Sequence, residues 1–71
     1  MVEQQARVLR LDELLKKEGV VRSGGEAKHL IQSGEVLLNG VVETRRKKQL
    51  AVGDVIEVGN VMLTLTEEDF G

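Results

Sequence analysis

The hydrophobic pattern of this 71-residue chain changes at Gly34, and the change restricts the folds open to it. Before Gly34, apolar residues recur at helical spacing. After it they form short runs of valine, leucine and isoleucine that are separated by turn dipeptides. We therefore predict an α+β domain, in which two short helices pack on a small, mainly antiparallel sheet.

The first half of the chain predicts helices over residues 11–18 and 22–33. Each carries an apolar stripe at i, i+3, i+4 spacing. The stripe residues are Leu11, Leu14 and Leu15 in the first helix and Ala27, Leu30 and Ile31 in the second. Ser23 is a suitable N-cap, and Glu26 follows at the capping-box spacing. Gly19 and Gly34 stand where the helices should end.

The second half predicts two hairpins. Asn39-Gly40 favours the positive φ angles of a type I′ turn, between runs 36–38 and 41–42. Gly59-Asn60 separates run 55–58 from run 61–65, whose alternating pattern predicts one buried face. Residues 2–9 are a candidate edge strand.

Composition limits the possible functions. With no cysteine, a single histidine and no serine–acid arrangement beside it, the chain offers no thiolate, metal cluster or activated nucleophile, so we expect neither an enzyme nor a cofactor. No apolar run approaches the roughly 20 residues that span a bilayer, and residues 1–10 lack a secretion segment. We expect one domain, residues 1–71, located in the cytoplasm and without a membrane partner.

Charge is unevenly distributed along the chain. The formal net charge is −2, yet residues 1–48 hold all ten lysines and arginines and carry +3, whereas residues 49–71 carry −5. Such a protein can bind a polyanion on one side and repel it from the other.

The strongest local signal is the basic run in loop 43–48. Arg45, Arg46, Lys47 and Lys48 are consecutive, and their mutual repulsion favours a loop over a packed strand. Arginine can donate two hydrogen bonds to a phosphate, and lysine adds a mobile charge. The alternative is a solvated loop that only maintains solubility. If the loop binds RNA, replacing Arg45 and Arg46 with alanine should weaken binding and leave the fold intact.

The start of the second helix is another candidate site. Gly24 and Gly25 leave backbone N–H groups open to a phosphate, and Arg22 and Lys28 flank them. The alternative is a flexible turn into a capped helix. His29 is expected on the exposed side of this helix, where RNA contact and a bland surface position are both open.

Two further observations concern the ligand. Arg10 begins the first helix and either contacts the ligand or pairs with an acid. Phe70 is the only aromatic residue, so the chain lacks the side chains on which single-strand binders stack bases. Contacts to phosphates and 2′-hydroxyls suit a folded RNA that is recognised by shape.

Together these residues resemble the S-four RNA-binding domain, also called the alpha-L RNA-binding motif, and the resemblance implies a core motif over residues 10–58. The matching positions are Arg10-Leu11-Asp12 with Leu15, Gly19, the helix from Ser23 to Gly34 with Ala27, Leu30 and Ile31, then Val36, Leu38-Asn39-Gly40, and Val52-Gly53-Asp54 with Ile56 and Val58. The stand-alone bacterial subfamily is similar in its Gly-Gly-x-Ala-Lys helix start and its Val-Glu-Thr-Arg-Arg loop, here 24–28 and 42–46.

The resemblance implies a binder of structured RNA, with ribosomal RNA or a ribosomal precursor as the expected partner, acting in ribosome biogenesis. It implies that helix 22–33 and the loop around Arg45 form the contact face. The chain departs from the family in one respect that matters, because many members carry arginine at the position of Gly24. Arg22 and Lys28 are the candidates to replace that arginine.

Two other functions remain open at this point. The acidic region 54–69 would suit a protein-interaction adaptor, which would keep its partner after nuclease treatment. A β-grasp sulfur carrier shares some of the turn signals, but its chemistry requires a Gly-Gly C-terminus and this chain ends in Asp69-Phe70-Gly71.

Overall fold

The computed structural model describes residues 8–70. Its elements run in the order α1 (Leu11–Lys17), α2 (Gly24–Gln32), β1 (Val36–Leu38), β2 (Val41–Val42), β3 (Val55–Val58), β4 (Val61–Thr64) and α3 (Glu67–Phe70). The predicted α+β architecture is confirmed. Most of the predicted edge strand over residues 2–9 lies outside the described residues.

Both predicted helices are present, but each is shorter than predicted: α1 ends at Lys17 and not at residue 18, and α2 runs from Gly24 to Gln32 and not over residues 22–33. The Ser23 hydroxyl accepts a hydrogen bond from the Glu26 N–H at 3.1 Å, as an N-cap should. The Glu26 carboxylate turns back to the Arg22 N–H at 2.7 Å, one residue earlier than in a standard capping box. Gly19 and Gly34 follow α1 and α2 with φ angles of 76° and 85°, which only glycine adopts readily.

The four strands form one antiparallel sheet in the order β2-β1-β3-β4. Asn39 and Gly40 both have positive φ, 53° and 84°, as the predicted type I′ turn requires. Gly59, also at positive φ, closes the second hairpin. The predicted last strand is one residue too long, since β4 ends at Thr64.

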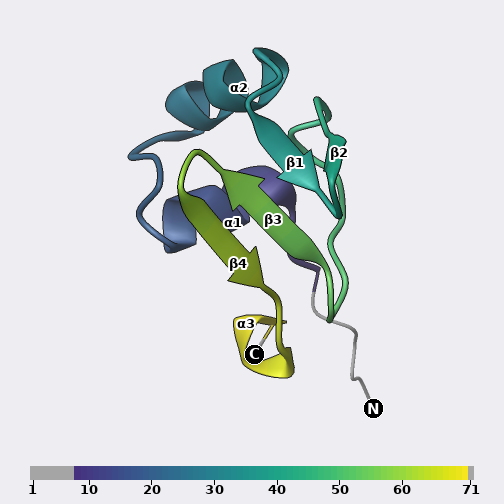
Figure 1. Ribbon diagram of the computed structural model, residues 1–71. Helices are drawn as coiled ribbons and strands as arrows, with labels where there is room; N and C mark the ends of the chain where they lie inside the picture. The colour runs from purple at the N-terminus through teal and green to yellow at the C-terminus, as the bar shows by residue number, and fades with distance from the viewer. Residues whose placement is uncertain (1–7, 71) are drawn as a thin grey trace.

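Helix α1 covers one face of the sheet (Figure 1). In Figure 1, α1 lies behind the strands, α2 lies beyond the end at which β1 begins, and no helix crosses the front. The core between helices and sheet is built from the predicted stripes and from inward strand residues. Its fully buried large side chains are Leu11, Leu14, Leu15, Ile31, Val36 and Ile56. Of the alternating residues in the predicted run 61–65, only Leu65, which follows β4, is deeply buried, whereas Leu63 is half-buried and Val61 is exposed.

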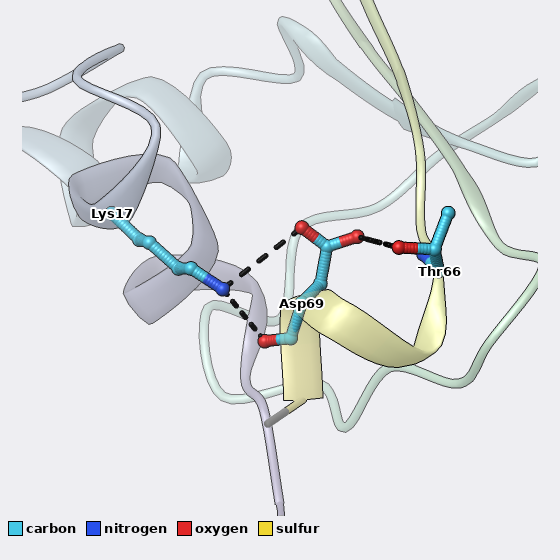
Figure 2. A network of polar contacts seen from close by, with 3 residues as sticks. All are labelled: Lys17, Thr66 and Asp69. Carbon is cyan, nitrogen blue, oxygen red and sulfur yellow. Dashed lines mark hydrogen bonds and ion pairs between the residues drawn. The ribbon is translucent and has the colours of Figure 1, made fainter.

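The sequence did not predict α3, a single turn that closes the chain against α1. The Thr66 N–H donates to the Asp69 carboxylate at 2.7 Å, which starts the turn. Lys17, at the end of α1, donates to the Asp69 carbonyl at 2.7 Å and lies 3.9 Å from its carboxylate (Figure 2). Phe70 packs on the edge of the core. Among the residues described, no helix is long and apolar enough to cross a membrane.

Candidate nucleic-acid interface

The basic loop is fixed in place by its own backbone. The carbonyl groups of Arg46 and Lys48 accept hydrogen bonds from the N–H groups of Asp12 and Leu11, at 2.9 and 3.0 Å. The Lys48 N–H donates to the Arg45 carbonyl at 3.1 Å and closes a turn. The first N–H groups of a helix have no partner within the helix, so this loop supplies the acceptors that α1 lacks. The loop is therefore held against the start of α1.

A buried carboxylate orients one of the loop arginines. Glu43 is only 8% exposed and accepts three hydrogen bonds from Arg45: from the backbone N–H at 2.9 Å, and from Nε and Nη2 at 3.0 Å each. These hydrogen bonds lower the pKa of Glu43 to about 2, against the opposing effect of burial, and the same partner raises the pKa of Arg45. The Arg45 side chain nevertheless stays 69% exposed.

The geometry of that pair leaves Arg45 able to bind an anion. A guanidinium has five N–H donors, and Glu43 occupies the edge formed by Nε and Nη2. The edge formed by Nη1 and Nη2 points away from the carboxylate and matches a phosphate bidentately. The charges of Glu43 and Arg45 nearly cancel, so Arg45 offers a phosphate oriented hydrogen-bond donors more than net positive charge.

Arg10 is brought to the same place from the other end of the motif. It forms an antiparallel bridge with Gln49, directly after the basic run. Its guanidinium lies 3.2 Å from Glu13 and 3.6 Å from the buried Asp12. Of the two roles open to Arg10, the structure shows the pairing with acids. We call Arg10 and the cations of the turn the loop cluster; its members are Arg10, Arg45, Arg46, Lys47 and Lys48.

The start of α2 holds the second group of candidate residues. Arg22, Lys28 and His29 are exposed, and we call them the α2 cluster. The N–H groups of Gly24 and Gly25 donate to none of residues 8–70. A Cβ added at Gly24 would meet nothing within 4 Å, and one added at Gly25 would meet only the Ser23 hydroxyl at 4.0 Å.

These two glycines are not required by the fold. Neither has positive φ, and neither is crowded by the protein itself. Glycine at a helical position costs up to about 1 kcal/mol relative to alanine. The pair therefore leaves the backbone of α2 accessible at a cost in stability, as a close approach by a phosphate would require.

The loop cluster and the α2 cluster lie in different parts of the molecule. In Figure 1 the start of α2 is on the left and the chain leaving β2 is on the right, with the end of α2 between them. The end of α2 adjoins β2, since a Cβ on Gly34 would lie 3.8 Å from Val42. Gly24 and Gln32 are about 12 Å apart along the helix axis, at about 1.5 Å per residue. The predicted residues thus form two groups, one from the start of α2 and one on the loop that follows β2 (Figure 1).

Sequence reasoning missed the role of Glu43. The basic run 43–48 predicts only a loop residue at this position, whereas Glu43 is the buried anchor of that loop. The spacing of Glu43 and Arg45 was the available signal, because a side chain two residues away can reach a loop carboxylate. The expectation that Arg45 can be removed without cost also changes, since its loss would leave a buried carboxylate unpaired.

The helix pair, the antiparallel sheet behind it and the loop held against α1 define the class as the alpha-L RNA-binding fold. The chain belongs to the S4 domain family, whose model matches residues 2–65. Its relatives include the Bacillus subtilis (strain 168) protein named "Probable ribosome maturation protein RlbA", 41% identical over 51 residues, which are 72% of each chain. The Escherichia coli (strain K12) protein named "Putative RNA-binding protein YbcJ" is 41% identical over 46 residues, 65% of this chain and 66% of that protein.

A solved structure supports the same assignment. The solution structure of YbcJ from E. coli, described as revealing an alpha-L motif involved in RNA binding, matches with a TM-score of 0.63. The match covers 92% of this chain and 81% of that one at 31% sequence identity. The fold predicted from the sequence resemblance is therefore confirmed.

Proposed function

We propose that this protein is a non-enzymatic module that binds structured RNA, with ribosomal RNA as its target, during ribosome maturation in the cytoplasm. The observation that carries the proposal is the attachment of the basic turn to α1 through Leu11 and Asp12. A turn held by its backbone presents its side chains without a large loss of loop entropy on binding. The names of the B. subtilis and E. coli relatives support the RNA target and the ribosomal process.

In the proposed complex the loop cluster contacts phosphates on one stretch of the RNA backbone. Arg45 binds with the edge that Glu43 leaves free, and Arg46, Lys47 and Lys48 add charge. A second phosphate approaches the open N–H groups of Gly24 and Gly25, with Arg22 or Lys28 beside it. Because the two contacts lie on separate elements that the fold holds in place, a folded RNA that holds phosphates at a fixed spacing fits better than a flexible single strand.

A salt titration tests the electrostatic part. Among residues 8–70, Arg22, Lys28, Arg46, Lys47 and Lys48 form no ion pair. If these five contact phosphates, log K against log[salt] should fall with a slope of about −4. The probes are purified ribosomal RNA, poly(U) and double-stranded DNA at equal phosphate concentration. A flat salt response, or equal affinity for poly(U) and ribosomal RNA, contradicts the proposal.

A matched pair of variants tests the site. Arg46→Ala with Lys47→Ala removes two cations and leaves the anchoring pair of Glu43 and Arg45 in place, so the fold should be retained. The slope should become less negative by about 1.5. The control, Lys16→Ala with Lys17→Ala, removes the same charge from the end of α1, and the slope should hardly change. Equal effects of the two variants would show that only net charge matters.

Crosslinking in cells followed by sequencing of the attached RNA would identify the target. Recovery of ribosomal RNA or its precursors is expected, and recovery of messenger RNA alone would contradict the proposed process.

A further inference from the structure

The face of the sheet that α1 leaves uncovered carries one continuous row of side chains. Paired residues of an antiparallel sheet point to the same side, and successive residues of a strand alternate. Val36 and Ile56 are fully buried, so their strand neighbours Leu37 and Glu57 point away from the core. Val42 pairs with Leu37, and Met62 pairs with Glu57. The row Val42–Leu37–Glu57–Met62 therefore crosses all four strands; we call it the open row.

This row combines apolar surface with a single negative charge. Met62 is 64% exposed, Val42 is 51% exposed, and Leu37 and Glu57 are half-buried. Val55 and Thr64, paired with each other, extend the same face. None of the four strands contains a lysine or an arginine. The face thus differs in chemistry from both cationic clusters and would repel an RNA backbone.

The two aspartates of the C-terminal third are already engaged within the protein, and Glu67 and Glu68 are exposed in α3, away from the sheet. The Asp54 carboxylate accepts hydrogen bonds from the Asn39 amide at 3.1 Å and the Ala51 N–H at 2.8 Å. Asp69 is bound to Thr66 and Lys17. The Glu57 carboxylate, by contrast, makes no hydrogen bond or ion pair with residues 8–70, and Glu57 pairs with the apolar Leu37 on one side and Met62 on the other.

We propose that the open row is a docking surface for an amphipathic helix of a basic partner protein, with a lysine or arginine of that helix placed against Glu57. Neighbouring strands are about 4.8 Å apart, so the row has positions at about 0, 5, 10 and 14 Å. A helix rising about 1.5 Å per residue presents i, i+3, i+7 and i+10 at nearly the same intervals and on one side. The partner pattern is therefore apolar, apolar, cation, apolar at those four positions.

Charge complementarity selects this occupant over a second copy of the chain. Stacking two open rows about a twofold axis would bring the two Glu57 carboxylates towards each other in an apolar contact, which is unfavourable without a cation. A partner that supplies the cation removes this penalty. The protein would then hold RNA on its helical side and a basic protein on its sheet side.

The test uses two synthetic 15-residue, alanine-based helical peptides. Both carry leucine at i, i+3 and i+10; one has lysine at i+7 and the other has glutamate. The wild-type protein should bind the lysine peptide at least about 5-fold more tightly than the glutamate peptide. Glu57→Lys should reverse this preference. The matched control is Glu18→Lys, which makes the same change in net charge at an exposed acid at the end of α1. A general effect of net charge would reverse the preference in both variants, so Glu18→Lys should keep the wild-type preference.

A second pair of variants tests the apolar part and does not depend on Glu57. Met62→Lys, on the open row, should weaken binding of the lysine peptide at least about 5-fold. Val52→Lys makes the same charge change at a residue that is 56% exposed in the turn before β3, and its effect should stay within about twofold. Circular dichroism confirms that each variant is folded.

Three results would overturn the proposal: failure of the lysine peptide to bind wild-type protein, retention of the wild-type preference by Glu57→Lys, and equal weakening by Met62→Lys and Val52→Lys. Self-association that Met62→Lys abolishes would also overturn it, since the row would then be a homodimer contact. When the peptide binds, changes in the NMR chemical shifts of backbone amides should concentrate in β1, β3 and β4. Changes confined to α2 and loop 43–48 would place the peptide on the proposed RNA-binding side instead.

Discussion

The substitution Glu43→Gln tests whether the basic loop is held by a buried charge. The Glu43 carboxylate accepts three hydrogen bonds from Arg45, and its pKa is about 2 instead of the ordinary 4.5. Glutamine retains one acceptor oxygen but carries no charge, and it turns an N–H₂ donor towards the guanidinium. The variant therefore removes the electrostatic part of the contact and keeps the shape of the side chain.

The size of the effect follows from the pKa and from the exposure of the partner. One pKa unit corresponds to about 1.4 kcal/mol, so the shift of Glu43 sets an upper bound of roughly 3 kcal/mol. The Arg45 side chain is largely exposed, and water screens the pair. We expect Glu43→Gln to lower the free energy of unfolding at pH 7 by about 1–2 kcal/mol. For a domain of this size the midpoint temperature should fall by roughly 5–10 °C.

The pH dependence of the free energy of unfolding shows whether the lost charge causes the destabilisation of Glu43→Gln. A carboxylate whose pKa is lower in the folded protein stabilises the fold fully above its unfolded pKa, near 4.5, and loses this contribution as the pH falls towards 2. The difference in stability between wild type and Glu43→Gln should be constant above about pH 5.5 and shrink between pH 4.5 and pH 2. Urea unfolding followed by far-ultraviolet circular dichroism is the suitable assay, because the chain contains no tryptophan or tyrosine.

Two outcomes would refute this reasoning. If Glu43→Gln is as stable as wild type at pH 7, the pair does not stabilise the folded loop. If a difference exists but does not change between pH 7 and pH 2, its cause is packing and not charge. Glu18→Gln, an exposed acid at the end of α1, is the matched control. A double-mutant cycle with Arg45→Ala should give a coupling of at least about 0.5 kcal/mol, since the two residues are in direct contact.

Three further predictions concern the helices. Ser23→Ala should lower the free energy of unfolding by about 1 kcal/mol, because the Glu26 N–H loses its acceptor; an unchanged urea midpoint would contradict the cap. Gly25→Ala should raise stability by about 0.5–1 kcal/mol and yet weaken binding to ribosomal RNA, whereas unchanged RNA affinity would show that no phosphate approaches α2 closely. Lys17→Met should cost less than about 1 kcal/mol, since the contact with Asp69 is exposed, and amide exchange should speed up in α3 without a change in α2; a larger loss would make α3 part of the core.

The parts of the fold that the sequence predicted are those specified by residues near one another in the chain. The Ser23 cap, the glycines after both helices and the Asn39-Gly40 turn each depend on a few adjacent residues, and each is present. The third helix was missed because a single turn has almost no periodicity to detect. It depends on Lys17, about 50 residues away, and no local pattern reports such a contact.

The candidate site was predicted less completely, for the same reason. The residue types were identified from the basic run and the paired glycines, but not their partners. That Arg10 is paired with acids, and that Arg45 is held by Glu43, follows from the folded positions of the side chains. Whether these residues contact RNA stays a prediction.

The two helix starts show why a sequence signal for anion binding needs the fold to interpret it. Both α1 and α2 begin with N–H groups that have no partner inside the helix. At α1 the carbonyls of Arg46 and Lys48 take up the N–H groups of Asp12 and Leu11, so this end is closed to a phosphate. At α2, Gly24 and Gly25 have no such acceptor among residues 8–70 and no neighbour that crowds them. The same loop that occupies the start of α1 carries the exposed Arg45 and Lys47 and the half-buried Arg46 and Lys48. Backbone contacts to an anion are thus expected at α2 alone, and side-chain contacts at the loop cluster.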